Sequence, residues 1–247
     1  MTSSSKYEGH RIAKIIARAG ICSRRDAERL VTDGRVTING KTIETPAINA
    51  GPYDIVAVDG ERLKAPGRPR LWRYHKPPGI INTHKDEKGR PTVFDSLPTS
   101  LPRVMSVGRL DLNSEGLLLL TDYGDLARTF ELPSTGWVRR YRARIHGHPK
   151  AEALDALAKG ITVDGVRYGS IIIKFDRQQT TNTWLTVSLK EGKNREIRRI
   201  MEHLNLQVSR LIRVSFGPFQ LGKLPAGDIA EVPYKVLKEQ VGNTLPV

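Results

Sequence analysis

A short polar stretch with several glycines and prolines divides this chain into two unequal parts. The stretch reads GERLKAPGRPR at residues 60–70, and its composition is typical of a linker between units that fold independently. We therefore predict a small domain at residues 9–60, a linker at 61–70 and a larger domain at 71–240. A chain of 247 residues is long enough to bury a core in the larger part.

The first part predicts two short helices followed by a hairpin. Apolar residues of 12–19 recur at helical spacing before Gly20, and Ser23 is placed to cap a second helix. Asn39-Gly40 lies between two short alternating runs, which indicates a hairpin with a type I′ turn. Residues 56–58 predict one more strand.

The predicted helices carry many cations that the apolar stripes leave free for phosphate groups. These cations are Arg11, Lys14, Arg18, Arg24, Arg25 and Arg29. A small unit of this kind offers no convergent acid and base groups, which favours a binding module over an enzyme. The stretch RIAKIIARAGICSRRDAERLVTDGRVTINGKTI resembles the S4-like RNA-binding domain of ribosomal proteins and RNA-modifying enzymes. That resemblance implies that these cations bind RNA.

The second part alternates short strands with helical stretches, without the regular strand-then-helix spacing of a parallel doubly wound sheet. Strands are predicted around 117–121, 138–146, 170–175, 184–189 and 207–216, and helices begin near Asp122, Lys150 and Asn194. Asn194 is placed to cap the last of these helices. We therefore predict an α+β protein whose larger domain holds a mixed, mainly antiparallel sheet.

The charge of the chain indicates a polyanionic partner. Forty Lys and Arg residues against 26 Asp and Glu residues give a formal charge of +14. Nucleic acid fits this charge better than a membrane surface, because no basic amphipathic helix with an aromatic face occurs. A basic surface that is merely solvated is the alternative.

The cysteine count and the hydrophobic pattern exclude several classes. Cys22 is the one cysteine, so no internal disulfide forms, and no Cys or His cluster has metal-ligand spacing. The N-terminal residues lack the apolar segment of a secretion signal, and no run of 18 apolar residues occurs. We expect a cytoplasmic monomer without a membrane partner.

Residues 107–127 hold the segment most suggestive of chemistry, VGRLDLNSEGLLLLTDYGDLA. In an extended stretch Arg109 and Asp111 point to the same side, and the guanidinium would keep the carboxylate ionised, as nucleophilic attack requires. The apolar run at 116–120 predicts a buried strand that supports the loop. On spacing alone, an Arg-Asp pair that only fixes a loop is the alternative.

The longer string GRLDLNSEGLLLLT closely resembles the catalytic motif of the pseudouridine synthases of the RsuA and RluB type. This resemblance implies that Asp111 is the catalytic nucleophile, with Arg109 beside it. RRYRARI at 139–145 and LKEGKNREIRRIM at 189–201 match the same family. They imply that Tyr141 stacks on the target base and that Arg198 pairs with the nucleophile; a core aromatic is the alternative for Tyr141.

Other cations in these segments are candidates for contact with RNA phosphates, and a plain solvated loop is the alternative for each. YHKPPGIINTHKDEKGRPTVFDSLP at 74–98 also looks like the start of the family's catalytic domain. The candidates there are Lys76, His84, Lys85, Lys88 and Arg90, and those near the predicted helix at Asn194 are Lys193, Arg195 and Arg199.

The resemblance extends over about residues 10–240 and implies the pseudouridine synthase fold and its reaction. In that reaction the bond between N1 and C1′ of a uridine breaks, the uracil turns, and C5 joins the ribose. No metal or cofactor is needed, and the sequence has neither a P-loop nor a GxGxxG segment. Asp111 could attack C1′ or the uracil ring, or first remove a ribose proton.

An S4-like domain followed by the segment at 74–98 most resembles the RluB type, which implies a hairpin-loop uridine of 23S ribosomal RNA, free or in a pre-ribosomal particle. The alternatives are the RsuA type, which acts on 16S RNA, and the RluF type, which acts on another large-subunit site. A non-catalytic RNA-binding protein of ribosome assembly is an alternative from another class. A sugar glycosidase fits poorly, because Glu115 follows Asp111 too closely.

Overall fold

The computed structural model describes residues 9–242, which form two compact units. The first contains residues 9–69 together with Leu101–Val104 and Asp122–Gly124. The second contains Arg70–Ser100, Met105–Thr121 and residues 125–242.

The first unit packs two helices and small sheets around one core. Its helices are α1 (Ile12–Arg18) and α2 (Arg24–Thr32), and its four-stranded sheet has the order β3 (Lys41–Thr42), β2 (Val36–Ile38), β5 (Val56–Val58) and β6 (Glu61–Arg62). A separate two-stranded sheet joins β1 (His10–Arg11) to β4 (Asn49–Ala50). Ile12, Ile16 and Val31 of the helices are fully buried with Val36 of the sheet.

The helix cap and the hairpin turn predicted for this unit are both present. Ser23 caps α2 and its hydroxyl oxygen accepts a hydrogen bond from the amide of Asp26 at 3.1 Å. Asn39 and Gly40 have φ angles of 53° and 79°, as a type I′ turn requires, and join the antiparallel strands β2 and β3. The predicted linker at 61–70 is too long at its start. Glu61 and Arg62 form β6, because their backbone extends the sheet beside β5.

The second unit is built on a nine-stranded sheet. Its main order is β13 (Ile171–Gln178), β14 (Asn182–Leu189), β10 (Arg139–His146), β15 (Gln207–Phe216), β9 (Glu115–Thr121), β7 (Leu71–Lys76) and β17 (Ile229–Glu231), with β8 (Met105–Val107) beside β9 and β16 (Phe219–Gln220) beside β15. Among the strands described, only β9 and β15 pair in parallel within this sheet. The α+β class and the mixed, mainly antiparallel sheet are thus confirmed.

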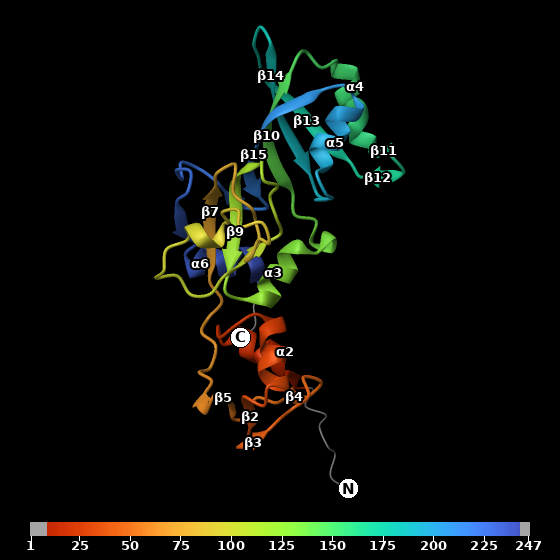
Figure 1. Ribbon diagram of the computed structural model, residues 1–247. Helices are drawn as coiled ribbons and strands as arrows, with labels where there is room; N and C mark the ends of the chain where they lie inside the picture. The colour runs from red at the N-terminus through yellow and green to blue at the C-terminus, as the bar shows by residue number, and fades with distance from the viewer. Residues whose placement is uncertain (1–8, 243–247) are drawn as a thin grey trace. The chain divides into compact units, whose positions relative to one another are not determined.

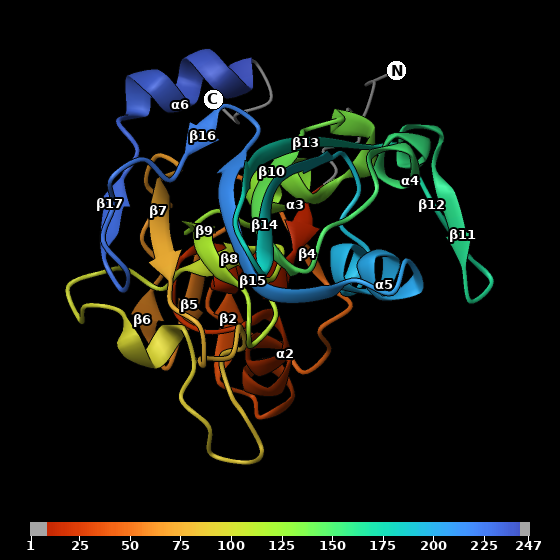
Figure 2. The same cartoon turned by 90° about the horizontal axis from the view of Figure 1, so that it is seen from above.

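Helices cover this sheet unevenly. Helices α4 (Ala151–Asp155) and α5 (Glu196–His203) lie with the hairpin of β11 (Ile161–Val163) and β12 (Val166–Tyr168) on one side of the strands β13, β14, β10 and β15 (Figure 1). Ile197 and Ile200 of α5 share a buried core there with Ala143 and Leu185. Helix α6 (Tyr234–Val241) lies at the other end of the sheet, near β17, as Figure 2 shows.

The predicted strands of this unit are all present, and helix α3 (Gly124–Glu131) begins close to Asp122. The strands β7, β8, β11, β12, β16 and β17 and helix α6 were not predicted. The predicted cap at Asn194 is wrong. Helix α5 begins at Glu196, and its N-cap Arg195 has a left-handed φ of 50° without a side-chain cap. The side chain of Asn194 instead accepts a hydrogen bond from Arg199 at 3.3 Å.

Residues 9–242 contain no helix that is long and apolar enough to cross a membrane. Within the same range, no group of three or more His, Cys, Asp and Glu side chains could hold a metal ion.

Candidate active site

Asp111 lies in the loop of residues 108–114, which joins the paired strands β8 and β9. Both ends of this loop are tied down. At its start, the carbonyl of Gly108 accepts a hydrogen bond from the Asn82 side chain at 3.2 Å, and the amide of Gly108 donates to the carboxylate of Glu131 at 2.7 Å. At its end, the amide of Ser114 donates to the carbonyl of Asp111 at 3.0 Å. The loop therefore presents Asp111 from a fixed backbone.

Lys76 also holds this loop, through hydrogen bonds to its backbone. The prediction that Lys76 contacts the RNA backbone is wrong. Its side chain is fully buried at the end of β7. The ammonium donates to the carbonyl oxygens of Pro77 at 3.0 Å, Leu112 at 3.3 Å and Ser114 at 3.0 Å. Burial lowers the pKa of Lys76 to about 8, and attraction to Asp111 and Glu115 opposes that shift. Lys76 thus positions the nucleophile loop and cannot reach solvent.

Arg198 also holds the loop, although the predicted ion pair with Asp111 is not formed. Its guanidinium donates to the carbonyl of Val208 at 2.8 Å and to that of Asn113 at 3.0 Å. The two Nη atoms are thus directed at backbone carbonyls, while Nε is buried without a hydrogen-bond partner among residues 9–242. Burial lowers the pKa of Arg198, repulsion from Arg195 lowers it further, and Asp111 opposes both effects.

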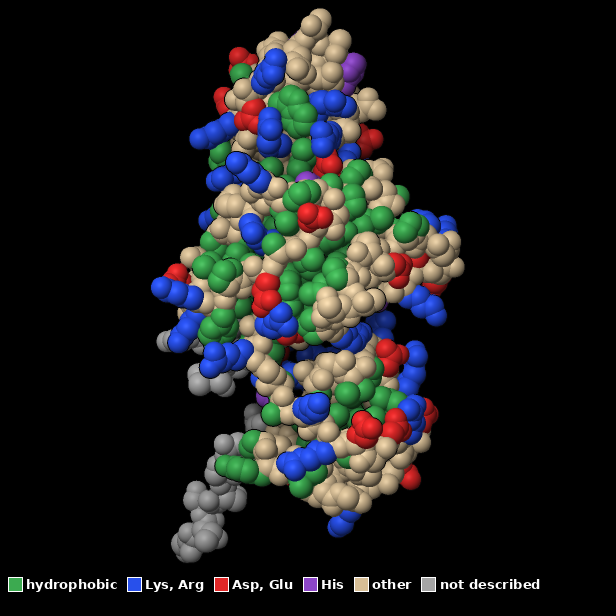
Figure 3. Space-filling model, turned by 90° about the vertical axis from the view of Figure 1, so that its left-hand side faces the viewer, with side chains coloured by type: hydrophobic (Ala, Val, Ile, Leu, Met, Phe, Trp, Pro, Cys, Tyr) green, Lys and Arg blue, Asp and Glu red, His purple; other side chains and the backbone are tan. Residues whose placement is uncertain are grey.

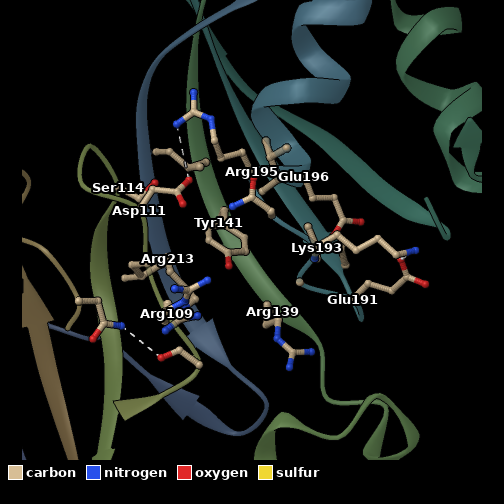
Figure 4. Close-up of a pocket in the computed structure, with 18 of the residues that line it drawn as sticks. Arg109, Asp111, Ser114, Arg139, Tyr141, Glu191, Lys193, Arg195, Glu196 and Arg213 are labelled. Atoms are coloured by element: carbon tan, nitrogen blue, oxygen red, sulfur yellow. Dashed lines mark hydrogen bonds and ion pairs between the residues drawn. The ribbon is translucent and has the colours of Figure 1, made fainter. Parts of the chain in front are cut away.

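The cation that does approach the nucleophile is Arg195, which was predicted to contact phosphates. Its Nη1 atom lies 4.0 Å from Oδ2 of Asp111. The side chain of Asp111 is 32% exposed and that of Arg195 is 49% exposed, so solvent screens this pair. The left-handed backbone of Arg195 before α5 directs its side chain toward the loop (Figure 4).

Arg109, predicted to lie beside Asp111, is exposed and forms no ion pair within 4 Å among residues 9–242. The backbone of residues 108–111 is not a strand, so the alternation on which the prediction depended does not apply. Arg109 lines the same pocket as Asp111 and is labelled with it in Figure 4.

A pocket of about 820 Å³ brings the candidate residues together. Asp111, Tyr141 and Arg195 line it, and Figure 4 shows their side chains around one space. Tyr141 is half-buried on the central strand β10, where its ring also packs against the core beneath α5. A planar base can stack on such a ring, and the stacking role of Tyr141 stays a prediction.

The floor of this pocket contains charged residues that the sequence analysis missed. Arg139, Glu196 and Arg213 line the pocket and are at most 9% exposed. Burial lowers the pKa of Arg139 and raises that of Glu196. Arg139 could have been found from its spacing, because residues two apart on a strand share a face and Tyr141 follows it by two.

A further ion pair lies just after the loop. Arg210 of β15 donates through Nε to the carboxylate of Glu115, the first residue of β9. The Glu115 side chain is only 10% exposed. The Glu115 carboxylate therefore interacts with two cations, Lys76 by electrostatic attraction and Arg210 by an ion pair. The ion pair links β9 to β15, the strands that support the loop.

The remaining RNA-contact candidates fall into two groups. Arg24, Arg25, Lys85 and Lys88 are exposed, Arg29 is exposed but pairs with Asp26, His84 is exposed and stacks on Phe94, and Lys14 and Arg18 are partly exposed, with Arg18 over the Tyr123 ring. The rest are exposed and make polar contacts within the protein: Arg11 with the carbonyl of Ala47, Arg90 with Asp86, Lys193 with Glu191 and the carbonyl of Arg167, and Arg199 with Asn194. RNA contact by either group stays a prediction.

The comparisons with known proteins agree with the two resemblances. The model of a family described as RNA pseudouridylate synthase matches residues 70–203, and an S4 domain model matches residues 10–56. A Rickettsia bellii protein described as an uncharacterized RNA pseudouridine synthase is 51% identical over 92% of this chain and 99% of its own length. The ribosomal large subunit pseudouridine synthase B of Haemophilus influenzae is 38% identical over 98% of this chain and 70% of its own length.

A solved structure supports the fold. The crystal structure of a pseudouridylate synthase superposes with a TM-score of 0.66 and covers 94% of this chain and all of its own. Its sequence is 22% identical.

Proposed function

Because the chain belongs to the RNA pseudouridylate synthase family, we propose that it converts a specific uridine of ribosomal RNA to pseudouridine. The observation that carries the proposal is the position of Asp111, a partly exposed carboxylate that lines a pocket with Tyr141 and Arg195. The loop bearing it is held by cations of two other elements, the buried Lys76 of β7 and the half-buried Arg198 of α5.

In this proposal each group has one task. Asp111 supplies the carboxylate that starts the isomerisation, and Arg195 balances its charge. Tyr141 forms one wall for the uracil, which must leave its stack to enter the pocket. Lys76 and Arg198 keep the carboxylate in place by binding the backbone carbonyls of the three residues that follow it, Leu112, Asn113 and Ser114.

We propose a hairpin-loop uridine of 23S RNA as the target. Support comes from the relatives called ribosomal large subunit pseudouridine synthase B in Yersinia pestis and Haemophilus influenzae, at 37% and 38% identity. The first unit, which matches the S4 domain, supplies the exposed cations Arg24 and Arg25 for the RNA backbone.

Chemical mapping of pseudouridine in ribosomal RNA tests both parts of the proposal. Cells that lack the protein are complemented with the native chain or with Asp111→Asn. The native chain should restore one 23S site, and Asp111→Asn should not, because an amide is a poor nucleophile and a poor base.

The variant should bind ribosomal RNA within about twofold of the native chain, since the one contact of the Asp111 carboxylate among residues 9–242 is the screened pair with Arg195 at 4.0 Å. A restored site in 16S RNA would contradict the 23S target alone. An unchanged modification map in the deleted strain would contradict the assignment to ribosomal RNA.

A further inference from the structure

One face of the second unit's sheet carries basic side chains on the side away from the pocket. Along β14, Leu185, Val187 and Leu189 are buried in the core under α5, so the alternating residues Trp184 and Thr186 point to the opposite face. Tyr141 and Leu211, which line the pocket, also belong to the core side. The opposite face is therefore a separate surface.

The strand register aligns cations in rows across this face. Arg177 of β13 is opposite Trp184 of β14, Trp184 is opposite Arg144 of β10, and Arg144 is opposite Arg210 of β15. In the next row Lys174 and Arg142 flank Thr186. We call Arg142, Arg144, Lys174, Arg177, Arg210 and Trp184 the basic sheet face. Figure 3 shows Lys and Arg side chains gathered around hydrophobic ones at the upper end of the molecule.

Carboxylates neutralise only part of this charge. Arg142 pairs with Asp176 at 3.2 Å, and Arg210 pairs with Glu115. Arg144, Lys174 and Arg177 form no ion pair within 4 Å among residues 9–242. Like charges directly opposite each other on neighbouring strands, such as Arg144 and Arg210, repel. The free protein thus carries an unfavourable charge pattern that a polyanion would relieve.

Trp184 makes nucleic acid the best match among polyanions. The guanidinium of Arg142 lies over its ring, 4.8 Å from the centroid, and the residue is half-buried, so part of the indole faces outward. An aromatic ring within a basic groove or face is the arrangement on which unpaired bases stack while cations hold the phosphates. An acidic protein surface would use the cations but not the ring.

We propose that the basic sheet face binds a second segment of the substrate RNA, distinct from the segment that delivers the uridine to Asp111. That this RNA is ribosomal RNA rests on the proposed function. The face and the pocket lie on opposite sides of the same strands. A hairpin loop bound in the pocket therefore cannot cover this face, which can bind a part of the same RNA molecule outside that hairpin loop.

The test measures binding of full-length 23S and 16S transcripts to the purified full chain at several salt concentrations. The variant is Arg144→Gln/Lys174→Gln/Arg177→Gln, which keeps the aliphatic stems. The matched control is Lys223→Gln/Lys235→Gln/Lys238→Gln, which removes three exposed charges near β17 and α6. Thermal unfolding of both variants checks that they fold like the native chain.

The face variant should lose about tenfold or more in affinity for the 23S transcript. The negative slope of log K against log salt should become less steep by about 2 to 3, whereas the control keeps the native slope. Equal slopes for both variants, or a native slope for the face variant, would overturn the proposal and favour a protein partner. A slope change with 16S RNA only would support the face and contradict the 23S target.

Trp184 provides a second readout. Stacking of a base should quench its emission, so the native chain should lose more fluorescence on addition of 23S RNA than Trp184→Phe does. Equal quenching in the two proteins would contradict contact between RNA and this face, whatever the outcome of the pseudouridine mapping.

Discussion

Lys76 is a fully buried lysine whose ammonium donates to three backbone carbonyls around the nucleophile loop. Burial lowers its pKa from an ordinary 10.5 to about 8. Above that pH the neutral amine has two N–H donors for three acceptors, and it no longer attracts Asp111 and Glu115. We expect turnover to fall as pH rises through about 8, which a kcat against pH profile would measure.

Stability should change in the opposite direction over the same range. Between pH 8 and 10.5 the unfolded chain keeps the proton that the folded protein has released, so this group's contribution to the free energy of unfolding rises with pH. The control is Lys76→Met, whose turnover should be about 10²-fold lower and should lack the step near pH 8. A native profile that stays flat through that step would contradict the role given to Lys76.

Substitutions of Arg195 and Arg198 should distinguish two roles: Arg195 balances the charge of Asp111, and Arg198 supports the loop that carries it. Arg198→Gln leaves the carbonyl of Asn113 or that of Val208 without its partly buried donor, which should cost roughly 1–3 kcal/mol of stability. Arg195→Gln removes an exposed pair and should change stability by less than about 0.5 kcal/mol. Both variants should lower kcat, and urea unfolding distinguishes them. Equal stability losses would contradict the assignment.

At the scale of elements, the parallel pairing of β9 with β15 depends on one glycine. Gly116 has a φ of 103°, and a Cβ atom there would lie 2.4 Å from the carbonyl oxygen of Arg213. The neighbour is backbone at the centre of the sheet and cannot move aside. Gly116 therefore allows β15 to approach the strand that follows the nucleophile loop.

Gly116→Ala should lower the free energy of unfolding by at least about 3 kcal/mol, because strain and a backbone clash act together. Gly108→Ala is the matched control. Gly108 also has a positive φ, 65°, but an added Cβ would have no atom within 4 Å, so the cost should be only about 1–2 kcal/mol. Denaturant unfolding compares the two, and equal losses would show that the contact with Arg213 does not matter.

At the scale of the whole molecule, the formal charge of +14 should make RNA binding strongly dependent on salt. If six or more phosphate contacts form, affinity should fall about 10³-fold between about 50 and 200 mM salt. The step at Asp111 takes place in a partly enclosed pocket, so KM should rise with salt while kcat stays nearly constant. A kcat that falls with salt at constant KM would contradict this division between binding and chemistry.

The sequence by itself determined the features that depend on neighbouring residues. Local spacing, turn chemistry and alternation predicted the first two helices with the Ser23 cap, the Asn39-Gly40 turn and the buried strand after Asp111. The α+β class follows from the same patterns. The resemblance of GRLDLNSEGLLLLT and of the S4-like stretch identified the family, and the family models match both regions.

Only the tertiary structure decided how the charged groups of the site are paired. Sequence spacing suggested Arg109 and the resemblance suggested Arg198 as neighbours of Asp111, yet Arg195 approaches it and Arg198 binds backbone carbonyls. Lys76 looked like a surface cation and is buried. The physical reason is that these distances depend on the register of β9 against β15 and on the placement of α5, segments separated by some 80 to 100 residues, and no local pattern encodes contacts of that range.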